Sequence, residues 1–598
     1  MRLIKFTVTG LLLCAMALGR VLPFAEALEV PVSSDTSSCD VQIGTDENSS
    51  ATPLGQTTTI SQFPSETNSH VANFLIDSTN QTSPFFETVL PAIAANIKEN
   101  NTHSINPHFD AIPNNRPTNN QNFQGLGVST YDNINGKTVT VEPFYRNYGE
   151  SYNDPNYGMG IMIYQCIQYK LAHPEENVKI TFSSYRTSAT AAVCVIPESK
   201  YYGLMRSLFG TNYDEHGFVR ISYMLVEAAR MGIEVTMINQ LPSYGTKQYN
   251  GVSGEVKTRS HIDFVQYFNE ALKTECYDKY VGEDKNVSDY LDFIVVDWLL
   301  DDQTQNMQHV KHAAVSHYLA TDGTEHSSAV FYSTANLDEN DYLGRNGNSF
   351  SQSGVIISDH DELYRTNHNY IMLMAKYKHK EGIQELRVIT SDRSEKQIAL
   401  LKAGRGAEIP KDEQIVYIGS ESDKIFELYF TPLGGASDAW DTDHNPVCNY
   451  TEKMAFSDDY VEFVCNQYAY GRSYFGYAVE RMLEVAYCQR PNPQNKISIK
   501  IDDFDTEAIN NLELGKDIGY RDIGPGVANR IHAKDFMLSY EEEGMRHYVS
   551  IMTSCNFGLV AYYYRTNSIL VIHETEETGN DYYETFGQKY SYGMIGSN

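Results

Sequence analysis

One short pattern occurs twice in this chain. The first copy reads HVKHAAVS and begins at His309, and the second reads HAKDFMLS and begins at His532. Each copy then turns near a glycine, Gly323 or Gly544, and returns through a second apolar segment. A pattern repeated together with its surroundings is a structural unit used twice. The sequence therefore predicts two related lobes arranged about a pseudo-twofold axis.

The repeat extends beyond the two hairpins. The return segments end in STAN, at Asn336, and in TSCN, at Asn556, and each leads into a further apolar strand pattern at 354–358 or 568–572. Ahead of each motif, helical spacing is followed by the alternation of a strand. Alternating helices and strands favour an α/β domain with a largely parallel or mixed sheet. These preceding segments are 221–230 with 233–237, and 474–488 with 497–501.

Composition divides the chain into four parts. Residues 1–27 combine a basic start, the apolar run GLLLCAMALG and the small-x-small site AEA, which predicts a secretory signal peptide and a secreted protein. Residues 28–125 are rich in Ser, Thr, Asn and Pro and are expected to be partly disordered. The two lobes are then expected at 126–375 and 376–598.

Charge and cysteine usage exclude some classes of function. The formal net charge of −31 repels phosphate backbones and anionic bilayers wherever a local basic patch is lacking. We therefore expect no nucleic-acid partner. Export permits disulfides, but a chain this long can bury a core without them, so we expect one or two bonds at most. None of the cysteines has CxxC spacing, and no zinc site is expected.

The repeated motif brings reactive groups together. Each His-x-Lys delivers an imidazole and an ammonium group to one surface, because residues i and i+2 of a strand point to the same side. The return segment adds a hydroxyl and an amide. If the two lobes meet, one cleft holds both sets, which suits a phosphodiester. We predict His309, Lys311, His532 and Lys534 as catalytic residues, and Thr334, Asn336, Ser554 and Asn556 as phosphate-binding residues.

The predicted set can carry out phosphoryl transfer without a metal. One neutral imidazole can attack phosphorus and form a phosphohistidine, while the other, protonated, donates to the leaving alcohol and then activates water or a second alcohol. Lysines and asparagines neutralise and orient the non-bridging oxygens, where charge builds up. No metal and no other cofactor is expected.

The two motifs resemble the signature of the phospholipase D superfamily, a duplicated His-x-Lys-x4-Asp followed by Gly-Ser-x-Asn. The resemblance implies two pseudo-twofold related α/β lobes, each a mixed β-sheet flanked by helices. It also implies that His309 is the nucleophile and His532 the general acid.

Two departures from that signature stand out. The motif Asp is replaced by Ser316 in the first copy and by Ser539 in the second. Many members also carry a Glu two residues after an Asn beyond the second motif, whereas here Asn567 is followed by Ser568 and Ile569. Because both copies changed alike while both histidines and both lysines remain, we favour a divergent but active subfamily.

Three functions remain open at this point. The first is an exported phosphodiesterase of the phospholipase D type, which hydrolyses or transphosphatidylates a phospholipid or related phosphodiester, with transient membrane-surface contact and as a monomer. The second is a catalytically weakened phosphate-ester-binding or surface-interaction protein on the same scaffold. The third is a nuclease, which the negative charge disfavours.

Overall fold

A computed structural model describes both halves of the chain that carry the repeat. The predicted signal peptide, the Ser/Thr/Asn-rich region at 28–125 and the helix expected at 474–488 lie outside the described residues. The described residues are 127–146, 155–187, 193–194, 218–219, 221–240, 246–257, 259–296, 308–320, 322–337, 351–378, 383–390, 398–404, 409–410, 413, 420, 423–431, 445–457, 459–470, 496–504, 519–522, 531–557, 562 and 566–586.

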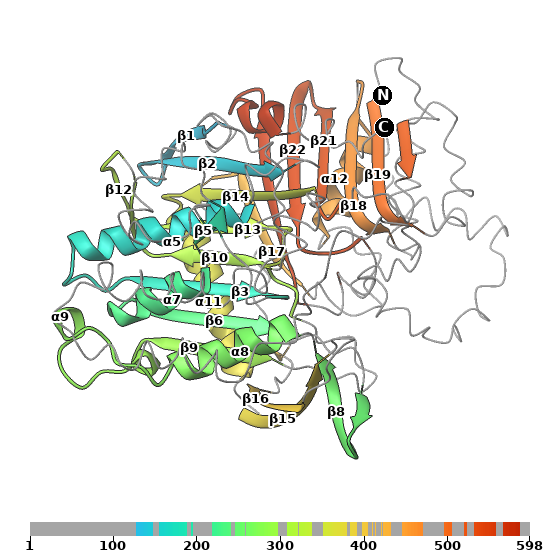
Figure 1. Cartoon of the computed structure of the whole chain (residues 1–598). Helices are drawn as coiled ribbons and strands as arrows, with labels where there is room; N and C mark the ends of the chain where they lie inside the picture. The colour runs from blue at the N-terminus through green and yellow to red at the C-terminus, as the bar shows by residue number, and fades with distance from the viewer. Residues whose placement is uncertain are drawn as a thin grey trace, which may run out of the picture.

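The first lobe is built on a mixed sheet of twelve strands (Figure 1). Their order is β1-β2-β14-β13-β10-β3-β6-β9-β16-β15-β8-β7. The strands are β1 (Ser129–Ile134), β2 (Lys137–Arg146), β3 (Lys179–Ser184), β6 (Glu234–Gln240), β7 (Thr246–Tyr249), β8 (Val252–Lys257), β9 (Leu291–Val296), β10 (His312–Val315), β13 (Ala329–Ser333), β14 (Gln352–Ser358), β15 (Ile383–Thr390) and β16 (Ile398–Gly404).

The second lobe is built on a mixed sheet of seven strands, in the order β17-β23-β22-β21-β18-β19-β20. In the view of Figure 1 these strands run up and down, whereas most strands of the first sheet run across the picture. The strands are β17 (Phe426–Phe430), β18 (Glu462–Tyr470), β19 (Lys496–Phe504), β20 (Gly519–Asp522), β21 (Lys534–Glu542), β22 (Met545–Thr553) and β23 (Ser568–Thr575).

The two sheets share one topology. In the first lobe, β2, β14, β13, β10 and β3 are successive antiparallel neighbours, and β3, β6 and β9 then run parallel. In the second lobe, β17, β23, β22, β21 and β18 are successive antiparallel neighbours, and β18, β19 and β20 then run parallel. The predicted α/β fold with two pseudo-twofold related lobes and mixed sheets is therefore confirmed.

Helices flank the sheets. In Figure 1, α5, α7 and α8 lie on the near face of the first sheet and α11 passes behind it. The helical segments are α5 (Pro155–Ala172), α7 (Ile221–Arg230), α8 (Arg259–Ala271), α9 (Asp278–Val281), η4 (Val287–Asp289), α11 (Asp361–Lys378) and α12 (Pro446–Ala455), and two small ribbons join β4 (Val193–Cys194) to β5 (Phe218–Val219) and β11 (Tyr318–Leu319) to β12 (Glu325–His326).

Local sequence signals explain the elements around the motifs. Helix α7 begins at Ile221 and ends at Arg230, as its apolar spacing predicts. Gly232 follows it with a φ of +80°, a left-handed conformation that glycine adopts without a Cβ clash. The hairpin turns also contain the predicted glycines, Gly323 at φ +88° and Gly544 at φ +78°.

An apolar core joins the two lobes. It contains Val330 and Val355 from the first sheet and Phe426, Met537 and Leu570 from the second, all with at most 6% of their surface exposed. Burying a side chain of this size stabilises the fold by about 1.5–3 kcal/mol. The lobes are thus held together by a shared core as well as by the contacts of the motifs.

The first sheet continues past the predicted lobe boundary at residue 375. Strand β15 pairs in parallel with β8 and antiparallel with β16, and β16 joins β9 through Gly404 and Val296. Residues 383–404 therefore contribute strands to the first sheet, although they follow the boundary in sequence. The boundary itself stays a prediction.

The described residues also bear on membrane-spanning helices and on disulfide bonds. No described helix is long and apolar enough to cross a membrane. The cysteines whose side chains are described are buried and free, so any disulfide of the predicted one or two must involve other cysteines. These free residues are Cys166, Cys276, Cys448, Cys465 and Cys555.

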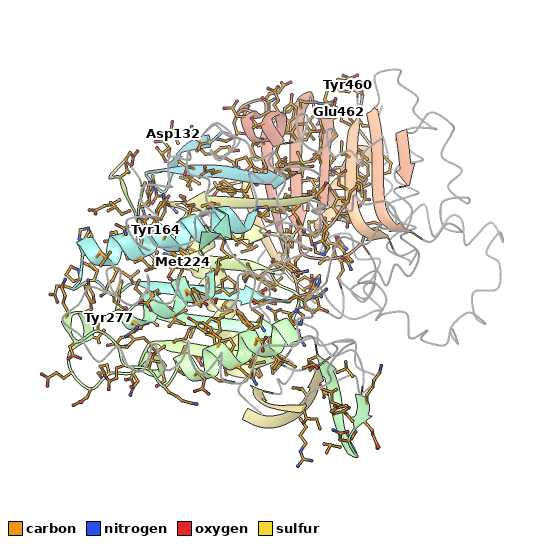
Figure 2. The ribbon with its side chains drawn as sticks, in the orientation of Figure 1. Asp132, Tyr164, Met224, Tyr277, Tyr460 and Glu462 are labelled. Atoms are coloured by element: carbon orange, nitrogen blue, oxygen red, sulfur yellow. The ribbon has the colours of Figure 1, made fainter. Side chains whose placement is uncertain are left out.

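A buried arginine and glutamate meet at the end of the first lobe where Figure 2 labels Tyr277, and burial raises the pKa of Glu227 to about 8. Arg230 and Glu227 are 2% and 3% exposed, and Nη1 of Arg230 lies 3.6 Å from Oε1 of Glu227. The hydroxyl of Tyr277 donates to Oε2 of Glu227 at 3.0 Å. The guanidinium of Arg230 also covers the Tyr277 ring at 4.3 Å.

We expect Arg230→Met to lower the free energy of unfolding by about 3–5 kcal/mol, because Glu227 is then left buried without its cation. The double variant Arg230→Met with Glu227→Gln should recover part of this loss. Urea unfolding measures both. As control, Lys273→Met removes an ion pair whose lysine side chain is 62% exposed, and should cost at most about 1 kcal/mol. Equal losses at the two sites would contradict the prediction.

Candidate active site

Both motif histidines lie where a central strand of one lobe begins beside the other lobe. His309 precedes β10, and its N–H donates to the carbonyl of Thr566 in the second lobe at 2.8 Å. His532 precedes β21, and its N–H donates to the carbonyl of Ser351 in the first lobe at 2.9 Å. The two halves of the repeat thus hold each other's motif by the same hydrogen bond.

The motif lysines are buried beside the histidines. Nζ of Lys311 donates to the carbonyl of His309 at 3.0 Å, and Nζ of Lys534 donates to the carbonyl of His532 at 2.8 Å. Their exposed fractions are 4% and 0%. Each motif therefore folds back on itself and fixes the ammonium group next to its own histidine.

An amide from the opposite lobe fixes each imidazole. Nδ1 of His309 donates to Oδ1 of Asn567 at 2.9 Å, and Nδ1 of His532 donates to Oε1 of Gln352 at 3.2 Å. An amide oxygen only accepts, so the hydrogen of each neutral imidazole resides on Nδ1. Nε2 is then the atom that carries the lone pair in both rings. This is the tautomer that a nucleophile or base acting through Nε2 requires.

The hydroxyls of Thr334 and Ser554 hold these amides. Oγ1 of Thr334 donates to Oε1 of Gln352 at 3.1 Å, and Oγ of Ser554 donates to Oδ1 of Asn567 at 3.1 Å. Both residues are buried, at 0% and 2% exposure. Their observed contacts orient the groups that orient the imidazoles.

The predicted asparagines occupy matched turns. Asn336 and Asn556 follow the ends of β13 and β22 and are 2% and 8% exposed. In both turns the residue before the asparagine donates its N–H to a hydroxyl two residues earlier, at 2.9 Å for Ala335 and 2.8 Å for Cys555. The amide atoms of Asn556 have no hydrogen-bond partner among the described residues.

The sequence reasoning missed several residues of the site. Gln352 and Asn567 stand at matched places at the start of the two apolar strands after the motifs, a signal that could have found them. Tyr185 follows β3, and its ring lies 4.7 Å from the His309 ring and 5.3 Å from Nζ of Lys311. Arg186 comes next in the chain and is 8% exposed.

Positively charged side chains act on His532. Burial lowers the pKa of His532 well below its usual value, and the positive charges of Lys534 and Lys311 lower it further, with smaller effects from His309 and Arg186. Five residues from both lobes are thus close enough to act on one another electrostatically. His532 is neutral near pH 7 when no anion is bound.

The two serines that replace the motif Asp lie far from this site. Oγ of Ser316 accepts from the N–H of Lys179 at 2.9 Å, where β3 begins. Oγ of Ser539 accepts from Nε of Arg546 at 2.7 Å, and Ser539 pairs with Glu462, which Figure 2 labels at the outer end of the second lobe. A strand rises about 3.3 Å per residue, so seven residues span about 23 Å. These positions secure the ends of strands.

The described part of the chain holds no group of three or more His, Cys, Asp or Glu side chains that could bind a metal ion. The positive charge that we find near the motif histidines comes from lysine and arginine side chains.

We expect the imidazole of His532 to remain neutral below pH 6.5, the usual pKa of histidine, because protonation must compete with burial and with two ammonium groups. Nitrogen NMR of the protein with labelled histidine measures this, and should report the hydrogen on Nδ1. Lys534→Met should raise the pKa. Lys179→Met, at the far end of β3, is the matched control and should leave it unchanged. An unshifted pKa near 6.5 in the wild type would refute the electrostatic interpretation.

Comparison with known proteins adds weak likenesses. No family model matches the chain, and no curated protein matches it in sequence. Among solved structures, a phosphatidylserine synthase from Haemophilus influenzae has 12% identity and a TM-score of 0.37, with 76% of this chain and 85% of that chain covered. Yeast tyrosyl-DNA phosphodiesterase has 9% identity and a TM-score of 0.29, with 66% and 82% covered.

This chain covers only about half of a third similar structure. Polyphosphate kinase from Porphyromonas gingivalis has 8% identity and a TM-score of 0.36, with 73% of this chain covered and 48% of the kinase, about half its length. At these scores the assignment depends on the chain's own features. The duplicated motif, the shared strand order and the reciprocal contacts of the motifs show an α/β fold of two related lobes, as the resemblance in sequence implied.

Proposed function

We propose that the protein is an exported phosphodiesterase of the phospholipase D type. The observation that carries the proposal is the pair of imidazoles, each held in the Nδ1–H tautomer by an amide of the opposite lobe. Two lysines lie buried beside them. A protein that only needed to hold a phosphate ester would gain nothing from fixing the tautomer of both rings.

The reaction takes place in two steps. Nε2 of His309 attacks phosphorus, the bond to the leaving oxygen breaks with its electron pair, and protonated His532 gives that oxygen its proton. Neutral His532 then takes a proton from water or an alcohol, which attacks phosphorus and returns the bonding pair to Nε2 of His309. The assignment of His309 as nucleophile follows the resemblance to the family.

The remaining residues neutralise the charge of the phosphate oxygens and hold the reacting groups in position. Lys311 and Lys534 neutralise the non-bridging oxygens, and Asn336 and Asn556 orient them. Thr334 and Ser554, first predicted to bind phosphate, are given a positioning role instead, because their hydroxyls hold the two amides. A bound phosphodiester brings negative charge against the lysines and so raises the pKa of His532, which lets it act as an acid.

The substrate class and the location are part of the same proposal. The acidic composition disfavours a long nucleic acid, and the N-terminal signal pattern supports export. A phospholipid or related phosphodiester, met during transient contact with a membrane surface by a monomer, fits both features. The nuclease and the non-catalytic binding protein remain the alternatives that experiment must separate.

We expect His309→Ala and His532→Ala each to lower turnover by at least about 10³-fold, because each removes one of the two proton- or phosphoryl-carrying groups. Headgroup release from mixed phosphatidylcholine, phosphatidylethanolamine and phosphatidylglycerol vesicles measures turnover. Phosphatidylethanol formed with added ethanol reports the covalent intermediate. Ser316→Ala, about 23 Å along the strand from His309, is the matched control and should keep activity within about threefold.

Full activity in both histidine variants would remove the proposal. If no headgroup is released from any of the three lipids, the next substrates to test are soluble phosphodiesters such as bis(p-nitrophenyl) phosphate, and single-stranded DNA. Binding of phosphate esters with no hydrolysis of any of them would favour the non-catalytic protein.

We also expect the two amides to control catalysis. Gln352→Leu and Asn567→Leu remove the acceptor that keeps the hydrogen on Nδ1, and should lower kcat by about 10²- to 10⁴-fold with little change in KM. Asn567→Asp keeps an acceptor and should retain more activity than Asn567→Leu. A loss confined to KM would show that the amides bind substrate rather than orient the imidazoles.

A further inference from the structure

A titratable side chain of the second motif lies inside the core that joins the two lobes. Asp535 follows Lys534 in β21 and is 0% exposed. Successive residues of a strand point to opposite faces, so the side chain of Asp535 lies on the face opposite to that of Lys534. Its neighbours on that face, Ala533 and Met537, belong to the apolar core shared by the lobes. Burying a carboxyl there costs stability unless it is hydrogen-bonded.

Asp535 forms a hydrogen bond across the lobe interface. Oγ of Ser353 in β14 donates to Oδ1 of Asp535 at 2.8 Å, and Ser353 is 0% exposed. Ser353 directly follows Gln352, whose amide oxygen accepts from Nδ1 of His532. The acid of the second lobe thus holds the strand of the first lobe at the point where that strand fixes the reacting imidazole.

Two hydroxyls and an amide connect Asp535 to the imidazole of His532. Oγ of Ser353 lies 3.4 Å from Oγ1 of Thr334, and the N–H of Ser353 donates to the same oxygen at 3.0 Å. Oγ1 of Thr334 donates to Oε1 of Gln352 at 3.1 Å. These three side chains form a hydrogen-bond relay from the carboxyl to the group that fixes the tautomer.

The described residues of the first lobe form no equivalent relay. His312 occupies the place of Asp535 in the first motif and is 1% exposed, and neither of its ring nitrogens has a hydrogen-bond partner in the described part of the chain. Its ring meets Tyr332 and Phe430 edge-on, at 5.7 and 6.3 Å between centroids. Burial lowers the pKa of His312 to about 3, so this ring is neutral near pH 7. The acid therefore belongs to the half of the repeat that carries His532.

The carboxyl of Asp535 changes its protonation state near neutral pH. Burial raises its pKa to about 7, although the hydrogen bond from Ser353 and the positive charge of Lys534 act in the opposite direction. Oδ2 of Asp535 has no hydrogen-bond partner among the described residues. The relay thus ends on a group that is protonated below this pH and ionised above it.

The neighbours of this carboxyl do not titrate in the same range. Asn466 of β18 and Met552 of β22 pair with Asp535 and carry no titratable group. Cys465 and Tyr582 interact with its charge, and burial raises the pKa of both, so they are uncharged near pH 7. A change of pH near 7 therefore acts on Asp535 itself rather than on these four residues.

Protonation changes which atoms of the relay donate. An ionised carboxyl only accepts, so Ser353 gives it the hydroxyl hydrogen and leaves its own oxygen as an acceptor for Thr334. A protonated carboxyl can donate to Ser353, whose hydrogen then turns to Oγ1 of Thr334. The hydroxyl of Thr334 then has one acceptor fewer and donates more fully to the amide of Gln352.

We propose that Asp535 is a positioning residue for His532 and acts through the relay. In its protonated form the relay holds the amide oxygen of Gln352 toward the imidazole, and in its ionised form this hold weakens. The inference rests on the proposed function, because it concerns the histidine that gives and takes the proton in that reaction. It describes an enzyme that works best below the pH at which Asp535 ionises.

Nitrogen NMR of the protein with labelled histidine tests the relay without a substrate. The measured quantity is the fraction of His532 that carries its hydrogen on Nδ1. We expect this fraction to fall as the pH rises through about 7. Asp535→Asn should keep it high and constant, because an amide donates to Ser353 at every pH, as the protonated acid does below its pKa.

Turnover of a phosphodiester gives the second measurement. In wild type kcat should fall above about pH 7 with KM unchanged, whereas Asp535→Asn should keep its kcat. Asp535→Leu has a similar volume but no hydrogen bond, and should lower kcat by about 10- to 100-fold, the range found when a group that orients a functional histidine is lost.

Asp132→Asn is the matched control. Asp132 also accepts from a hydroxyl, that of Thr138 at 2.7 Å, but it is exposed and lies in the edge strand β1, where Figure 2 labels it. This variant should show the pH dependence of wild type in both measurements.

Two results would overturn the inference. One is a fraction of Nδ1–H that stays constant with pH in wild type, and the other is the same pH dependence in wild type and in Asp535→Asn. The wild-type titration decides the matter even where a variant fails to fold.

The proposed function can fail independently. A tautomer that follows Asp535 in a protein that cleaves no phosphodiester would support the relay and contradict the phosphodiesterase. Cleavage by a protein whose tautomer does not change with pH would support the phosphodiesterase and contradict the relay.

Discussion

The structure depends on a reciprocal exchange between its lobes. Gln308, next to the first motif, forms a bridge with Thr566, and Ile531, next to the second motif, forms the same bridge with Ser351. Asn567 follows Thr566 and fixes the imidazole of His309. In the same way Gln352 follows Ser351 and fixes the imidazole of His532. One backbone contact therefore sets both the docking of the lobes and the tautomer of the reactive rings. Neither lobe presents a correctly oriented imidazole alone.

The parts of the fold that could be predicted are those written in local sequence. The hairpins, their glycine turns and helix α7 follow from apolar spacing and from residues that tolerate a positive φ. The duplication added what local patterns lack, because two copies of one strand order imply two lobes that pair. The position of β15 and β16 in the first sheet could not be seen, since their pairing with β8 and β9 joins segments far apart in the chain.

The candidate site shows the same division. His309, Lys311, His532 and Lys534 were visible because a repeated pattern marks them. Gln352 and Asn567 also occupy matched places at the start of two apolar strands, but that match does not show what an amide there contacts; the fold places each one on an imidazole. The hydroxyls of Thr334 and Ser554 were predicted to bind phosphate, which stays a prediction; the sequence shows that they return to the site, and the structure adds that they contact the amides of Gln352 and Asn567.

The two serines in place of the motif Asp show that a sequence signature can contain both residues of the site and residues that only form contacts at strand ends. In this structure those positions secure strand ends, at Lys179 for Ser316 and at Arg546 for Ser539, so their replacement bears on local stability rather than on the reacting groups. The two serines nevertheless accept from different donors, a backbone N–H for Ser316 and a guanidinium for Ser539.

The chain carries a net negative charge, whereas the lysines beside the motif histidines are positively charged. Together these charges limit which anions can bind. A formal charge of −31 repels extended polyanions, while buried lysines and an arginine attract an anion that is small enough to reach them. The lobes that carry these residues share one apolar core. This core and the backbone bonds of His309 and His532 hold the two lobes together. The interactions that stabilise the fold therefore also keep both imidazoles and both lysines beside each other.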